Sequence, residues 1–162
     1  MKRLSLALLL ALLAGGAQAL EQGERLAPWT LLDQYEKPYS LDNQLGLLLV
    51  ARDMDGAKLV KAALDGKPKD FLEQRHAVFV ADISRMPSVI SKLFAVPAMQ
   101  DYNYRVLLDR ESRVAPRYEA PEGQVLVLTL RDGVLQGQKA FASAESLRAA
   151  LDAALDAVPP AP

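Results

Sequence analysis

The sequence predicts an α/β domain in which one central sheet is flanked by helices. One observation behind this prediction is a pair of apolar runs without polar alternation, residues 45–51 and 76–81, a pattern typical of strands buried on both faces of a sheet. Another is that apolar residues at helical spacing follow these runs, such as Ala57, Val60 and Leu64 after the first. With 162 residues, the chain suits one domain with short extensions.

The first half of the domain should begin with a β-hairpin. Residues 29–32 and 39–41 are short strand-like runs, and the polar stretch between them indicates a turn. The first long strand comes next, and the helix after it should end at Gly66. His76 is expected to begin the second buried strand. A further helix then starts near Pro87, and its apolar face consists of Val89, Ile90, Leu93 and Phe94.

The second half should contain a strand over residues 104–108, a hairpin and a last helix. The hairpin is expected over residues 125–141, because Asp132-Gly133 in its middle is a strong turn signal. Ser143 should cap the last helix, whose apolar face carries Leu147, Leu151 and Leu155. We place the domain at residues 20–156 and expect the Pro-rich residues 157–162 to be disordered.

Residues 1–19 have the pattern of a secretory signal peptide. Lys2 and Arg3 precede an apolar run over residues 4–14, and Ala17-Gln18-Ala19 is a small-residue cleavage site. A membrane anchor is the alternative, but the run is shorter than the roughly 20 apolar residues that a spanning helix needs. We therefore expect cleavage, export and a periplasmic location, with no membrane span in the mature chain.

The composition excludes several classes of function. The chain has 19 basic and 20 acidic residues, so it lacks the positive charge expected of a nucleic-acid-binding protein. It has no cysteine, which excludes disulfides, thiol catalysis and cysteine-ligated metals. Its single histidine, His76, has no second histidine with which to form a metal pair. We expect no cofactor.

The order of the expected elements resembles that of thioredoxin-like proteins of the peroxiredoxin and TlpA-like type. Residues 26–34 (Leu-Ala-Pro-Trp-Thr-Leu-Leu-Asp-Gln) and residues 37–41 look like the N-terminal segment of those families. Residues 104–109, followed by residues 113–118, are similar to the family's strand–turn–strand insertion. The resemblance covers residues 26–155. It implies a central mixed sheet flanked by helices, with an N-terminal β-hairpin extension.

The residues that the family uses for redox chemistry are missing. Redox members carry a catalytic Cys just after the first core strand, where this chain has Gly56 and Leu59. They also place a cis-proline before the next-to-last strand, where this chain has Gln124. A cis bond before a non-proline residue costs about 2.5–4 kcal/mol, so we expect a trans bond there. Disulfide exchange and thiol-peroxidase chemistry are excluded, because Asp or Lys cannot replace a thiolate.

Charged residues form a candidate ligand face at the ends of the two buried strands. Arg52, Asp53 and Asp55 follow the first strand, and Asp82 and Arg85 follow the second. The carboxyl ends of parallel strands are the usual ligand sites of α/β sheets, and three carboxylates there would suit Mg²⁺ or Ca²⁺. In the simpler interpretation, Asp53 or Asp55 caps the following helix and the arginines pair with the carboxylates.

Two more specific metal motifs fit less well. Residues 53–56, Asp-Met-Asp-Gly, resemble the first motif of haloacid-dehalogenase-type phosphatases, in which the first Asp is the nucleophile. Thr129 would supply the second motif, but the later acidic pair is missing. An EF-hand is excluded because position 12 of the loop would fall on Ala62.

Two functions remain open from the sequence. The first is a non-redox binding or adaptor module that contacts another periplasmic protein or a small ligand. The second is a divalent-cation-binding protein or metal-dependent hydrolase centred on Asp53, Asp55 and Asp82. The sequence indicates neither the identity of the partner nor the oligomeric state.

Overall fold

The structure is a computed structural model that describes residues 19–154. The expected Pro-rich tail lies outside these residues, as do Leu155 and nearly all of the expected signal peptide. Within residues 19–154, no helix is long and apolar enough to cross a membrane.

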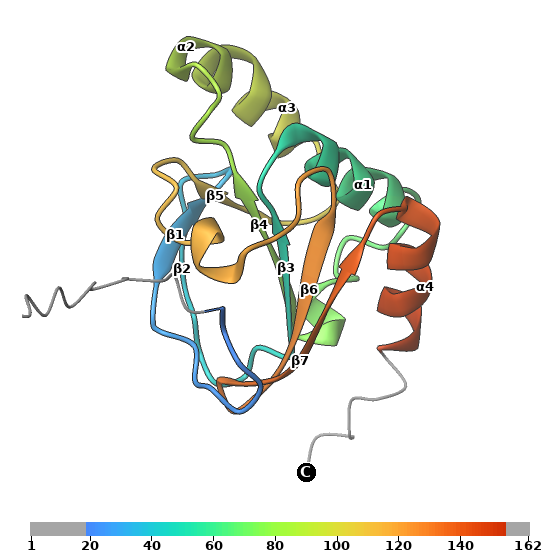
Figure 1. Cartoon of the computed structure of the whole chain (residues 1–162). Coiled ribbons are helices and arrows are strands. Elements are labelled where there is room, and N and C mark those ends of the chain that lie inside the picture. The colour runs from blue at the N-terminus through green and yellow to red at the C-terminus, as the bar shows by residue number, and fades with distance from the viewer. Residues whose placement is uncertain (1–18, 155–162) are drawn as a thin grey trace, which may run out of the picture.

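Seven strands form one mixed sheet in the order β2-β1-β5-β4-β3-β6-β7 (Figure 1). The strands are β1 (Thr30–Asp33), β2 (Pro38–Ser40), β3 (Leu47–Ala51), β4 (Ala77–Asp82), β5 (Val106–Asp109), β6 (Val125–Arg131) and β7 (Val134–Phe141). Strands β3, β4 and β5 are parallel, whereas β1 and β6 run antiparallel to their neighbours. This confirms the expected mixed sheet, with β1 and β2 as an N-terminal hairpin.

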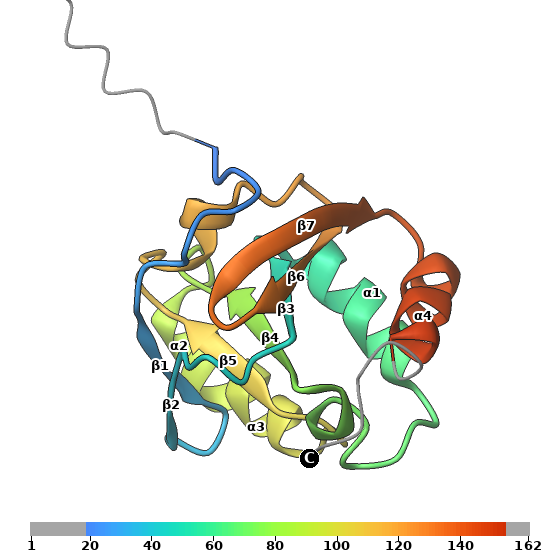
Figure 2. The ribbon, with the colours of Figure 1, turned by 90° about the horizontal axis from the view of Figure 1, so that it is seen from below.

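Helices α1 and α4 lie side by side on one face of the sheet (Figure 2). The longer helices are α1 (Met54–Leu64) and α4 (Ala144–Ala153). The connection from β4 to β5 is a helical segment made of α2 (Ser88–Ile90), the π-helix η2 (Ser91–Ala95) and α3 (Val96–Gln100). Two short 3-10 turns complete the described chain, η1 (Glu73–Arg75) and η3 (Ala115–Tyr118).

The sheet separates two apolar clusters. Successive side chains of a strand point to opposite faces, so Leu49 packs with the helices α1 and α4 while Leu48 packs on the other side. That other side is covered by the N-terminal segment and η3, where the Nε1 of Trp29 donates a buried hydrogen bond to the hydroxyl of Tyr118 (2.7 Å). Strand β3 is therefore buried on both faces, as its unbroken apolar run predicts.

Local signals in the sequence place several boundaries correctly. The Asp53 side chain caps α1, and the Ser143 side chain caps α4. Asp132 and Gly133 both have positive φ, 52° and 76°, which is the backbone that a tight β6–β7 hairpin needs.

Two expectations are wrong in detail. His76 does not begin a strand: it is exposed, takes up a left-handed conformation (φ 48°) and closes the η1 turn, and β4 starts one residue later. Residues 113–118 do not form a strand either. The buried carboxylate of Asp109 accepts hydrogen bonds from the N–H groups of Arg113, Val114 and Ala115, which holds the chain in the η3 turn.

Candidate functional site

Asp53 fixes the start of α1 at the carboxyl end of β3. One oxygen of its carboxylate accepts a hydrogen bond from the N–H of Gly56 (2.8 Å), and the other accepts one from the N–H of Gly123 (2.7 Å). Burial raises the pKa of Asp53, but these backbone donors and the charge of Arg52 outweigh it and hold the pKa below its ordinary value of 3.8. The carboxylate therefore joins the helix to the loop before β6.

Gly56 and Gln124 meet where redox members of the resembled families would carry their thiol and their proline. Gly56 is buried, and a Cβ on it would lie 2.5 Å from the carbonyl oxygen of Gln124 and 3.1 Å from the Cβ of Ala51. No peptide bond of the described residues is cis. Leu59 is the second residue at the place where redox members carry their thiols. It is partly buried and packs against the apolar cluster under α1. A side chain at residue 56 therefore has no room unless the loop moves.

Three of the five candidate ligand residues gather in one cavity. Arg52, Asp82 and Arg85 line a volume of about 450 Å³ together with residues of the η3 region. The Asp82 carboxylate accepts hydrogen bonds from the N–H of Ser84 (2.9 Å) and the hydroxyl of Ser112 (2.7 Å). The guanidinium of Arg85 lies 3.8 Å from the carboxylate of Glu122, and both side chains are exposed. The neighbouring ends of β3 and β4 bring these groups together.

The other two candidate residues, Asp53 and Asp55, do not line that cavity. Asp53 binds backbone N–H groups, and the exposed Asp55 pairs with Lys58 on the first turns of α1 (3.1 Å). Within residues 19–154, no group of three or more histidine or acidic side chains has the arrangement to hold a metal ion. Thr129 pairs with Leu47 at the opposite end of β3 from Asp53, so the two phosphatase-like motifs are far apart on the sheet. The interpretation of Asp53 as a cap describes this geometry best.

A surface that the sequence did not single out as functional lies on the β4–β5 connection. Val89, Ile90, Leu93 and Phe94 were expected to form one apolar helix face, and the structure leaves them 62%, 46%, 64% and 64% exposed. We call these four residues the apolar face. In Figure 1 the segment that carries it projects beyond the end of β4.

The π-helix explains which side of this segment turns inward. Ser91, Val96 and Met99 are buried, and the step from residue 91 to residue 96 is five residues, as in a π-turn. In a regular α-helix the inward position after Ser91 would be Ala95. The extra residue places Val96 against the core, and the apolar face lies on the exposed side of the same segment.

The fold is shared with proteins of known structure. No protein-family model matches the chain, and no curated protein matches it either. Solved structures do match. The peroxidoxin BcpB of Mycobacterium tuberculosis is 17% identical, with a TM-score of 0.59 over 86% of this chain and 99% of that one. The thioredoxin domain of a thiol-disulfide oxidoreductase from Bacteroides vulgatus is 13% identical, with a TM-score of 0.55 over 83% and 98%.

A peroxiredoxin-like protein from Aquifex aeolicus is 8% identical, with a TM-score of 0.52 over 85% of this chain and 89% of that one. The chain has a thioredoxin-like fold. At these identities the likeness concerns the fold alone, and the thiol chemistry named for these proteins does not transfer. This thioredoxin-like chain has no cysteine anywhere in its sequence, so its fold is compatible with a non-redox role.

Proposed function

We propose that this protein is an exported, non-redox binding module that docks another protein through its apolar face. The observation that carries the proposal is the exposure of Val89, Ile90, Leu93 and Phe94, four large apolar side chains within six residues. Contiguous exposed apolar groups of this kind mark interaction sites in soluble proteins. Burying one such side chain from full exposure contributes about 1.5–3 kcal/mol, and these four are still about half exposed, so a partner that covers all four gains roughly half of that from each.

Charges around the apolar face favour a partner with an acidic rim. Arg85, Lys92 and Arg110 line a cavity beside it, together with a single acidic side chain, Glu36. Arg110 already pairs with Glu36 (2.8 Å). Lys92 and Arg85, whose exposed guanidinium lies 3.8 Å from Glu122, therefore stand at the edge of the face, and complementary carboxylates on the partner would speed and orient docking.

The proposed location is the periplasm, and the proposed partner is another periplasmic protein. Support comes from residues 1–19, whose basic head, apolar run and small-residue cleavage site are those of a signal peptide. The cysteine-free composition agrees with a role in which binding, and not thiol exchange, is the function.

The test is a pull-down from periplasmic extract with matched variants. The double variant Leu93→Glu/Phe94→Glu changes the net charge by −2 within the apolar face, and Lys69→Glu makes the same charge change at an exposed site on another loop. We expect the same partner with the unchanged protein and with Lys69→Glu, and none with the double variant. All three should melt at the same temperature, because the changed side chains are exposed. Equal capture by the double variant would refute the proposal.

A further inference from the structure

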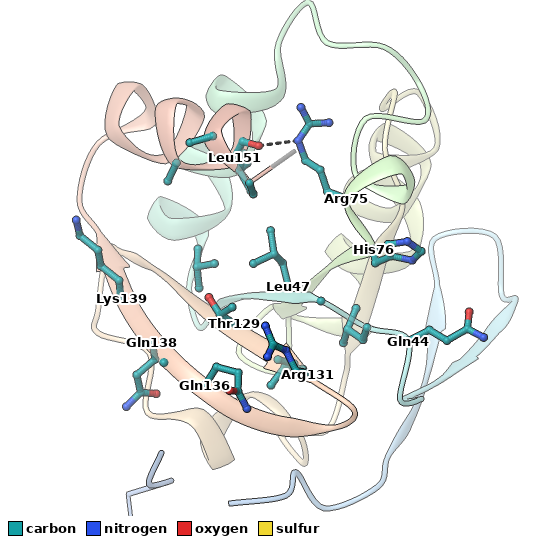
Figure 3. Close-up of a pocket in the computed structure, with 18 of the residues that line it drawn as sticks. Gln44, Leu47, Arg75, His76, Thr129, Arg131, Gln136, Gln138, Lys139 and Leu151 are labelled. Carbon is teal, nitrogen blue, oxygen red and sulfur yellow. Dashed lines mark hydrogen bonds between the residues drawn. The ribbon is translucent and has the colours of Figure 1, made fainter. Parts of the chain in front are cut away.

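A third cavity, separate from the apolar face and the cavities near it, lies at the opposite end of the sheet. It has a volume of about 1000 Å³, at the upper end of the range of small-molecule pockets. Figure 3 shows Leu47 and Thr129 between Leu151 of α4 on one side and Arg131 and Gln136 of the β6–β7 hairpin on the other. We call this cavity the lower pocket.

Within residues 19–154, α4 spans a shorter length than the β6–β7 hairpin beside the lower pocket. Strand β7 has 8 residues and spans about 27 Å at 3.4 Å per residue, whereas the 10 residues of α4 span about 15 Å at 1.5 Å per residue. Among the described residues, no helix lies over the lower half of this sheet face. Small residues line the lower pocket: Ala150 and Ala153 lie on α4, and Ala154 follows it directly. A Cβ added to Gly137 on β7 would meet nothing within 4 Å.

The lining of the pocket is apolar in its interior and cationic at its edge. Leu47, Val127, Phe141 and Leu151 supply apolar surface. The charged lining residues in the described chain are Arg75, Arg131, Lys139 and a single acid, Asp132.

The three cations are not equivalent. Arg75 is 3% exposed and already donates hydrogen bonds to the carbonyl oxygens of Leu151 (2.6 Å) and Phe71 (2.7 Å), so it fixes the end of α4. Arg131 and Lys139 are exposed side chains on adjacent strands. Figure 3 shows Arg131 below the middle of the pocket and Lys139 at its side.

We propose that the lower pocket binds a single-chain amphiphile with an anionic head, of the fatty-acid class. Its alkyl chain lies against Leu47, Val127 and Ala150, and its carboxylate pairs with Arg131. The guanidinium fork matches a carboxylate in two parallel hydrogen bonds, and Lys139 adds to the attraction for the anion. The proposal does not depend on the docking function of the apolar face, because the two sites share no residue.

The first experiment is calorimetric titration of the purified protein with laurate below its micelle concentration. We expect saturable binding whose affinity falls about fourfold for each methylene removed, because each buried methylene contributes a fixed increment of binding free energy. Decanoate lacks two methylenes of laurate and should bind about 16-fold more weakly, and octanoate, which lacks four, weaker still. Dodecyltrimethylammonium, which has the same chain and a positive head, should bind at least tenfold more weakly. Absence of saturable binding, or equal affinity for the cationic probe, would overturn the proposal.

Variants then locate the ligand. Gly137→Phe places a ring in the pocket from a position where a Cβ meets nothing within 4 Å, and it should abolish laurate binding while the melting temperature stays the same or rises. Arg131→Gln should weaken binding about tenfold or more, and the matched surface change Lys69→Gln should leave it unaltered. Undiminished binding by Gly137→Phe would show that the site is wrong.

Two further outcomes would assign the pocket to a different occupant. If the protein were a dimer in solution that Gly137→Phe converts to a monomer, a second copy of the chain would be the occupant. If deletion of residues 155–162, which follow directly from Ala154 at the rim, raised laurate affinity more than tenfold, the chain itself would compete for the pocket. Either result contradicts a site built for a free amphiphile.

Discussion

Replacing Gly56 with Ala should destabilise this protein although it removes a glycine from a helix. In a helix interior, Gly to Ala normally adds about 1 kcal/mol of stability. Here the new Cβ would lie 2.5 Å from the carbonyl oxygen of Gln124, about 0.9 Å short of an ordinary contact of 3.4 Å. The carbonyl belongs to backbone that the Asp53–Gly123 hydrogen bond holds against the helix, so it cannot turn aside freely.

The expected size of the effect follows from these opposing contributions. Overpacking of this kind costs about 1–3 kcal/mol, and the displaced loop also weakens the bond to Gly123. After the helix-propensity gain is subtracted, we expect a net loss of about 1–2 kcal/mol. For a domain of this size that corresponds to a melting temperature lower by roughly 3–6 °C.

The measurement is urea unfolding followed by the fluorescence of Trp29, the single and buried tryptophan. The control is Gly137→Ala, whose Cβ meets nothing within 4 Å and which should be neutral or stabilising by up to about 1 kcal/mol. If Gly56→Ala were as stable as Gly137→Ala, the close approach of α1 to Gln124 would be refuted. The explanation that residue 56 must be glycine because the carbonyl of Gln124 lies so close would then also be refuted.

Three other predictions concern the hydrogen bonds that hold the domain together. The stability that Asp53→Asn lacks relative to the unchanged protein, about 1–2 kcal/mol, should be constant well above pH 3.8 and should shrink as the pH falls through 3.8 toward the lower folded pKa of Asp53; a difference that does not change at all with pH on acidification would contradict this. Tyr118→Phe leaves the buried Nε1–H of Trp29 without its acceptor and should cost about 1–3 kcal/mol by thermal unfolding, and a loss under 0.5 kcal/mol would count against that bond. Gln34→Leu should cost about 3 kcal/mol or more in urea unfolding, because the buried Gln34 side chain donates to the carbonyl of Tyr104 and accepts from the N–H of Val106; a neutral effect would exclude this role.

Much of the fold could be predicted from the sequence because its signals are local. The unbroken apolar run at residues 47–51 indicates a strand buried on both faces, and Asp132-Gly133 specifies a hairpin through its positive φ angles. The caps at Asp53 and Ser143 depend on a side chain and an N–H group only three residues away. His76 was misplaced because its left-handed backbone follows from the turn that η1 needs, which apolar patterning does not report.

The candidate sites could be predicted only in part, since they depend on contacts between distant segments. Arg52, Asp82 and Arg85 come together because β3 and β4 are parallel neighbours, and that follows from the fold. The bond from Asp53 to Gly123, 70 residues away, has no local signal. Periodicity showed that residues 89–94 have an apolar face but not whether anything covers it, and the pattern does not report the π-turn over residues 91–95.

The most direct test of the central claim, that this thioredoxin-like protein acts by docking through its apolar face, is site-specific photo-crosslinking in living cells. A benzophenone amino acid replaces Phe94 in one strain and the exposed Lys69 in another. The account predicts one discrete adduct with a second protein at residue 94 and none at residue 69. No adduct at residue 94, or the same adduct from both positions, would contradict it.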